Sequence, residues 1–380
     1  MTCWARGGAR SSSSGRPRRC RRPTPYSPSD RSRHAAIALS LLPGVGAKAF
    51  RELIARFGSS ASAWDATPAS SARAEASELA AEAIERAQRV GARVLVRELE
   101  GYPEPLLQLA DPPSVLYAIG NLDLLRAPCI AIVGTRRATS YGERVTAEIA
   151  AALARAGATI ISGMARGIDG VAHRAALSAG GATAAVLGTG VDVAYPAAHR
   201  ALHEEIAARG LLLSEELPGD RASGGSFPKR NRLIAALARA TIVVEAPHRS
   251  GALITANDAL LLNRDVAAVP GPIDVPQSAG SNLLLRDGAI MINDIADALA
   301  LAGVSAPVAR SAAPADATLL AVWNALDAPA PDLDSLASRA ELPARRCLAA
   351  VTVLELEGSI ECALTGEIRR RGTLARSFGR

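Results

Sequence analysis

The chain has 380 residues, 49% of them hydrophobic and 3% aromatic, with 43 Lys and Arg against 37 Asp and Glu. This length fits two or three domains, and the hydrophobic content excludes wholesale disorder, while no apolar run reaches the roughly 18–20 residues that cross a bilayer. Of the net charge of +6, residues 1–33 carry +8 and residues 361–380 carry +3, so residues 34–360 carry −5 and exclude polyanion binding by bulk charge alone.

Residues 1–33 contain nine Arg and almost no aliphatic side chains. Such a segment cannot bury enough apolar surface to offset the entropy of ordering its backbone, so we predict a disordered basic tail. The segment also lacks the apolar stretch of a secretory signal, and we therefore expect a cytoplasmic protein.

Residues 34–105 are predicted to form a small helical domain. An apolar helix at 36–42 is followed by a Pro-Gly-Val-Gly turn at 43–46 and a second helix at 48–57. A helix, a Gly-x-Gly turn and a helix are typical of a helix-hairpin-helix (SAM-like) module, whose turn can direct backbone N–H groups at a phosphate. A plain helical packing module explains the same pattern equally well.

Residues 106–302 alternate short β-rich runs with helical stretches. Strands are predicted at 115–119, 129–134, 159–163, 183–188, 211–214, 241–245, 266–269 and 289–292. Helices are predicted at 142–156, 170–179, 198–208, 231–238, 253–262 and 293–301. This alternation predicts an α/β fold, with a Rossmann-like parallel sheet covered by helices on both faces.

Residues 303–316 are rich in Ala, Pro and Ser and are predicted to be a linker. Residues 317–380 are predicted to form three helices, at 317–326, 333–339 and 343–357, followed by a short hairpin, which is the order of a winged-helix domain. The third helix carries Glu355 and Glu357, which repel phosphate, so a protein-binding or packing role is at least as well supported as DNA binding.

The loops that follow the predicted strands are the candidate site, because open α/β sheets bind ligands at the carboxyl ends of their strands. Glycines there allow close backbone approach, hydroxyls and helix N-termini donate to anions, and cations add charge at the same edge. We predict a phosphate-binding rim that suits an extended polyanion better than one small phosphate. The candidate residues are Gly134, Thr135, Arg136, Ser162, Gly163, Arg166, Gly167, Phe227, Lys229, Arg230, Asn231, Arg232, Ser250 and Thr255.

Motifs of nucleotide enzymes are missing. The sequence has no phosphate-binding P-loop and no G-x-S-x-G nucleophile elbow, so no catalytic residue and no cofactor is predicted. The five scattered cysteines form no Cys-x-x-Cys pair, so neither a disulfide framework nor a metal site is expected. Asp169 and Glu245 are the best candidates for buried carboxylates, with capping and loop hydrogen bonding favoured over chemistry. Tyr141 and Phe227 are candidates for stacking on bases, although packing under its own loop is an alternative for Phe227.

Four motifs in order resemble the bacterial DNA-processing protein A (DprA/Smf) family: IVGTR at 132–136, SGMARGID at 162–169, FPKRNR at 227–232 and SGALIT at 250–255. The resemblance covers residues 37–302 well and 317–380 as the winged-helix module. It implies a core that binds single-stranded DNA with little sequence preference and has no known enzymatic activity. It further implies protection of incoming strands in natural transformation, loading of RecA, displacement of single-strand binding protein and a homodimer formed through the core.

The resemblance also assigns the family's basic positions to Arg136, Arg166, Lys229, Arg230 and Arg232. Two alternatives stay open. One is a nucleotide-binding or nucleotide-hydrolysing Rossmann-like enzyme, although the P-G-G-x-G-T loop of such enzymes is missing at 250–255. The other is a protein-interaction scaffold built on the hairpin and winged-helix modules.

Overall fold

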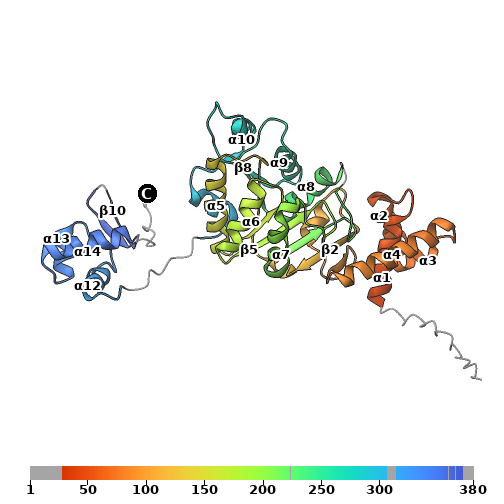
Figure 1. The fold of residues 1–380 in the computed structure, drawn as a ribbon, viewed down its shortest axis with the longest axis horizontal. Helices are drawn as coiled ribbons and strands as arrows, with labels where there is room; N and C mark the ends of the chain where they lie inside the picture. The colour runs from red at the N-terminus through yellow and green to blue at the C-terminus, as the bar shows by residue number, and fades with distance from the viewer. Residues whose placement is uncertain (1–27, 223, 306–313, 358, 364, 371–380) are drawn as a thin grey trace, which may run out of the picture.

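The computed structural model describes residues 28–222, 224–305, 314–357, 359–363 and 365–370 (Figure 1). The N-terminal module consists of four helices, α1 (Pro28–Leu41), α2 (Ala47–Phe57), α3 (Ser60–Ala66) and α4 (Ser71–Arg89). The two helices predicted around the Gly-x-Gly turn are present as α1 and α2. Gly44 adopts a φ of 80° in this turn, which favours glycine.

The predicted disordered tail is wrong for residues 28–33, which form the beginning of α1. Ion pairs hold this part of the helix, from Arg33 to Asp30 at 3.0 Å and from Arg31 to Asp65 at 2.6 Å. The following stretch, 35–39, is fully buried and anchors the helix, a contribution that the Arg-rich composition before it concealed. Residues 1–27 lie outside the described residues.

A nine-stranded sheet forms the second unit, in the order β1-β2-β6-β5-β4-β3-β7-β8-β9. Its strands are β1 (Arg93–Val96), β2 (Val115–Gly120), β3 (Cys129–Val133), β4 (Thr159–Ser162), β5 (Ala182–Leu187), β6 (Leu211–Ser214), β7 (Ala240–Val243), β8 (Asp265–Ala268) and β9 (Ile290–Met291). Along this order, every pair of neighbouring strands from β6 to β9, including β5, β4 and β3, is parallel, as predicted. Strands β2 and β1 extend the sheet beyond β6 in antiparallel pairs.

The predicted boundary at residue 105 is wrong, because β1 already belongs to the sheet. Its four residues follow α4 closely and pair with β2 in register, with Arg93 opposite Ala118. Such a short strand gives no clear alternation of its own, so the sequence pattern merges it with the preceding helices. Helices α1 and α4 pack against β1, which joins the N-terminal module to the sheet.

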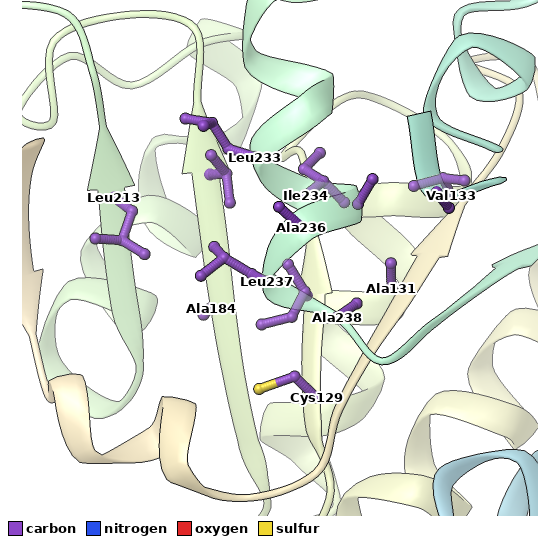
Figure 2. Packing of buried hydrophobic residues seen from close by; sticks show 14 of the residues in the cluster. Cys129, Ala131, Val133, Ala184, Leu213, Leu233, Ile234, Ala236, Leu237 and Ala238 are labelled. Carbon is purple, nitrogen blue, oxygen red and sulfur yellow. The ribbon is translucent and has the colours of Figure 1, made fainter. Parts of the chain in front are cut away.

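Helices cover both faces of the sheet. One face packs against α5 (Ser140–Arg155), α6 (Ile168–Ser178), α7 (Arg200–Arg209) and α11 (Ile295–Ala302). The other packs against α8 (Ser226–Leu237), α9 (Gly251–Leu261) and α10 (Ala279–Arg286), the last of which the sequence pattern did not predict. Figure 2 shows Leu233, Ile234 and Leu237 of α8 against side chains of β3, β5 and β6.

The C-terminal unit has the predicted winged-helix order. Its elements are α12 (Ala317–Ala325), α13 (Leu333–Arg339), α14 (Ala344–Leu356), β10 (Ile360–Cys362) and β11 (Ile368–Arg370). Val322, Leu336 and Leu354 are buried together in its core, and β10 and β11 form the antiparallel hairpin. Residues 371–380, which we assigned to this domain, lie outside the described residues.

His173 of α6 makes the folded state sensitive to acid. The ring is fully buried, its Nδ1 lies 2.7 Å from the Thr183 hydroxyl, and burial lowers its pKa to about 3. The unfolded chain binds a proton near pH 6.5 and the folded chain does not, so stability falls as pH drops below that value. This group is expected to cost about 2 kcal/mol of unfolding free energy between pH 7 and pH 5.

Urea denaturation of the wild type and of His173→Gln at both pH values checks this. The variant is expected to lose less stability on acidification by about that amount. A substitution at the exposed His248 is the matched control. If the unfolding free energy depended equally on pH in the wild type and in His173→Gln, His173 would not be the source of the acid sensitivity.

Candidate nucleic-acid interface

The sheet order places a crevice between β3 and β7. The chain runs outward from β3 through β4, β5 and β6 on one side, and then returns to β7 on the other side of β3. Ligands of open α/β sheets bind at such a switch point, outside the carboxyl ends of the strands. Two adjoining cavities, each of about 500 Å³, lie at this edge. We call them pocket A, over β4 and β5, and pocket B, over β3 and the start of α9.

The loop after β3 presents two exposed cations, Arg136 and Arg137, which line both pockets. Its backbone is held in place by the segment after β7. The Thr135 N–H donates to the Glu245 carbonyl at 2.7 Å, and the buried Glu245 carboxylate accepts from the N–H and hydroxyl of Thr139. Glu245 therefore positions this loop, and it is not among the residues that line either pocket.

A side chain at Gly134 would collide with this arrangement, because its Cβ would lie 2.5 Å from Cγ1 of Ile168. The neighbouring loop after β4 is equally confined. Gly167 has a φ of 72°, and a Cβ there would lie 2.3 Å from the Thr135 carbonyl oxygen. The two loops thus meet through glycine, and Arg166 on the second loop is exposed in pocket A beside Arg136.

Asp169 holds the backbone of the loop after β4 through hydrogen bonds. Its buried carboxylate accepts hydrogen bonds from the N–H groups of Gly163, at 3.2 Å, and Ala165, at 3.3 Å, while burial raises its pKa. Ser162 is fully buried and donates to the Ile132 carbonyl at 2.6 Å. Both side chains hold the backbone of the site in place, and Asp169 makes the loop hydrogen bonds that the sequence favoured for it.

Arg230 of α8 is a buried brace between strands. The residue is only 6% exposed, and its guanidinium donates to the carbonyl oxygens of Gly163, at 2.7 Å, and Val186. Burial lowers its pKa to about 10, so the group stays protonated at neutral pH. Arg230 lines both pockets and fixes the ends of β4 and β5, so its positive charge lies at the base of the site.

An aromatic pair forms one wall of pocket A. The rings of Phe227 and Tyr195 lie 5.3 Å apart between centroids at an angle of 36°, and the Arg136 guanidinium lies 5.4 Å from the Phe227 centroid. Tyr195 is 47% exposed, which leaves a ring available for stacking. By contrast, Tyr141 is not among the lining residues, and its hydroxyl donates to the Pro270 carbonyl at 2.9 Å.

Polar groups at the start of α9 line pocket B. Ser250 caps this helix, accepting from the Ala252 N–H at 3.3 Å, and Thr255 donates to the Gly251 carbonyl at 3.4 Å. Asn231 of α8 reaches the same carbonyl at 3.2 Å. The helix N-terminus and these groups give pocket B an environment suited to an anion.

The structure brings most of the predicted residues together. Those that line pocket A or B are Gly134, Thr135, Arg136, Gly163, Arg166, Phe227, Arg230, Asn231, Ser250 and Thr255. The others do not line them: Ser162 and Gly167 support the loops, and Lys229 and Arg232 face Glu215 on the β6 side. Sequence reasoning missed Arg137 and Tyr195, although an aromatic side chain in the loop after the β5 strand was a usable signal.

Within the residues that the structure describes, no cluster of three or more His, Cys, Asp and Glu side chains could hold a metal ion. The same residues include no helix that is long and apolar enough to cross a membrane.

Comparisons with known proteins agree with these features. Residues 93–303 match the family described as DNA recombination-mediator protein A. Residues 30–90 match a DprA-like N-terminal HHH domain, and residues 306–363 match a DprA winged helix domain.

Individual relatives are similar over the same part of the chain. Protein Smf of Synechocystis sp. is 46% identical over 213 residues, which are 55% of this chain and 54% of that protein. The putative DNA processing protein DprA of Mycobacterium tuberculosis is 44% identical over 260 residues, 66% of this chain and 67% of that protein. The chain thus spans about half the length of the first relative and about two thirds of the second.

Two solved structures share the fold. DNA processing protein A from Streptococcus pneumoniae matches with a TM-score of 0.63 and 33% identity, over 71% of this chain and 97% of that one. DNA processing protein A from Helicobacter pylori, whose structure concerns a unique single-stranded DNA binding mode, matches with a TM-score of 0.50 and 35% identity. That match covers 54% of this chain and 93% of that one.

Proposed function

The chain belongs to the family of DNA recombination-mediator protein A, and from this premise we propose that it binds single-stranded DNA along pockets A and B. The observation that carries the proposal is the set of exposed, unpaired cations around an aromatic wall. Arg136, Arg137 and Arg166 form no ion pair in the described part of the chain, and Phe227 and Tyr195 lie beside them. Cations that follow a backbone and rings that stack on bases are what sequence-tolerant strand binding requires.

The local patch, and not the basic tail, is proposed to carry this binding. Deleting residues 1–27 removes seven Arg and no acidic residue. If the site lies at the sheet edge, the shortened chain keeps its affinity for an oligo-dT strand within about threefold at ~150 mM salt, where charges more than about 8 Å from the strand are largely screened. Fluorescence anisotropy measures this, and loss of most of the affinity would move the site to the tail.

We further propose that the bound strand is protected and handed to RecA during natural transformation or recombination, in the cytoplasm. The family membership supports this role. The test is RecA filament formation on strands coated with single-strand binding protein, with and without this chain. Faster filament growth is the expected result, and a variant with Arg136 and Arg166 replaced by Ala is expected to lose the effect. Unchanged filament growth with the wild type would refute RecA loading and leave strand binding intact.

A homodimer through the sheet domain is also proposed. Strand β9 ends the sheet, and its Ile290 and Met291 are 44% and 52% exposed. Leu260 and Leu261 at the end of α9 are 55% and 75% exposed, and an exposed edge with apolar side chains is a surface suited to pairing with a second copy. Light scattering is expected to give a dimer for the wild type and a monomer for Leu261→Asp combined with Met291→Asp.

A further inference from the structure

Glu215 holds two of the cations that the sequence assigned to DNA. This residue directly follows β6, and its side chain is 18% exposed. It accepts from Arg232 through both oxygens, at 2.7 and 2.9 Å, and lies 3.3 Å from the Lys229 ammonium. Arg232 also donates to the Asp111 carbonyl at 2.7 Å and is only 16% exposed, whereas Lys229 is 50% exposed.

The geometry of α8 explains why these two cations lie outside the pockets. Phe227, Arg230 and Asn231 line the pockets at a spacing of three and four residues, which marks one helix face. Lys229 and Arg232, three residues apart, lie on a different face, above β6. Lys229, Arg230 and Arg232 lie within one short sequence motif, but on the helix they occupy two different faces.

The β6 side of the rim is acidic beyond Glu215. Glu216 and Asp220 lie in the same loop, and their carboxyl pKa values are raised, chiefly by burial and in part by neighbouring carboxylates. Lys229 acts in the opposite direction on Glu216, so this lysine lies among carboxylates. The carboxyl edge of the sheet thus changes from unpaired arginines over β3 and β4 to paired cations and carboxylates over β6.

We propose that Glu215 limits the affinity of the strand site by holding Lys229 and Arg232 in ion pairs, so that a bound strand passes over β3, β4 and β5 and gains no phosphate contact over β6. This inference rests on the proposed strand binding at pockets A and B. The consequence is that removing this acidic residue makes the protein bind more tightly, because Lys229 is already half exposed and becomes free to contact a phosphate.

The variant Glu215→Gln tests this, since its amide oxygen still accepts from Arg232 while the negative charge is gone. Anisotropy with a labelled oligo-dT strand over a salt series is expected to show about threefold to tenfold tighter binding at ~50 mM salt. The slope of log affinity against log salt is expected to steepen by about 0.7, which corresponds to one added phosphate contact. In Glu215→Gln/Lys229→Gln the gain is expected to disappear.

The control is Glu143→Gln, which removes the same charge from the exposed first turn of α5, at the same edge and away from Lys229. An equal gain there, or an unchanged or weaker affinity in Glu215→Gln, overturns the proposal. Lys229→Gln alone does not depend on how well Glu215→Gln folds: a change within twofold supports the proposal, and a loss as large as that of Arg166→Gln overturns it. If Arg136→Ala/Arg166→Ala still weakens binding, the strand site stands even where the Glu215 inference fails.

Discussion

Replacing Arg136 and Arg166 together by Ala is expected to weaken binding of single-stranded DNA by about 100-fold or more at ~100 mM salt. Each guanidinium is exposed at the rim of pocket A and forms no ion pair in the described part of the chain, so each is free to donate to a phosphate. A hydrogen bond between charged groups is worth about 1.5–3 kcal/mol, and two of them account for a loss of this size. The salt slope is expected to fall by about 1.4, for two phosphates.

The matched control is Arg126→Ala/Arg155→Ala. These arginines precede β3 and end α5, so they lie at the opposite, amino edge of the strands, and their removal changes the net charge equally. We expect the affinity of this double variant for single-stranded DNA to stay within about threefold of the wild type, because it loses only a screened long-range attraction. Equal losses in the two double variants would show that total charge, and not the rim, determines binding.

Replacing Arg230 by Leu is expected to have the largest effect on stability, about 3–5 kcal/mol. The side chain is the buried brace of the site, and its loss leaves the carbonyl oxygens of Gly163 and Val186 without their donor. It also removes the larger of the two positive charges, those of Arg230 and Arg136, that stabilise the buried Asp169 carboxylate. Circular dichroism during heating is expected to show the sheet domain melting about 10 °C lower.

Arg166→Leu is the control for this variant, because the same change at an exposed position is expected to alter stability by about 0.5 kcal/mol or less. An Arg230→Leu protein that melts with the wild type would show that the brace contributes nothing to the fold. DNA binding by Arg230→Leu is expected to be weak for the same reason, since the ends of β4 and β5 would no longer be fixed.

Much of the rim could be predicted because its signals are local. Arg136 and Arg166 follow buried strands in loops with glycine, and the parallel sheet brings such loops to one edge. The role of Arg230 was out of reach, since it depends on which face of α8 meets the sheet. Lys229, Arg230 and Arg232 are all cations in one motif, and only the packing of Leu233, Ile234 and Leu237 against β3, β5 and β6 decides their directions (Figure 2).

The features that sequence reasoning missed are short or irregular. Strand β1 has four residues directly after a long helix, and α10 has eight residues after a Pro-rich loop, so neither shows a full period of its pattern. Tyr195 lies in a loop without regular structure, and its contact with Phe227 joins this loop to the first turn of α8. The first turns of α1 were missed because the buried stretch that anchors them, 35–39, follows an Arg-rich segment whose own composition indicates no core.

Photochemical cross-linking tests most directly where the strand binds. Single-stranded DNA carrying 5-iodo-deoxyuridine is irradiated in complex with the full chain, and the attached peptides are identified by mass spectrometry. Because aromatic rings that stack on bases react most readily, we expect cross-links at Tyr195 and Phe227, and we expect them to be lost when Arg136 and Arg166 are replaced by Ala. Cross-links confined to the N-terminal helices or to α14, and unaffected by those substitutions, would contradict strand binding at pockets A and B.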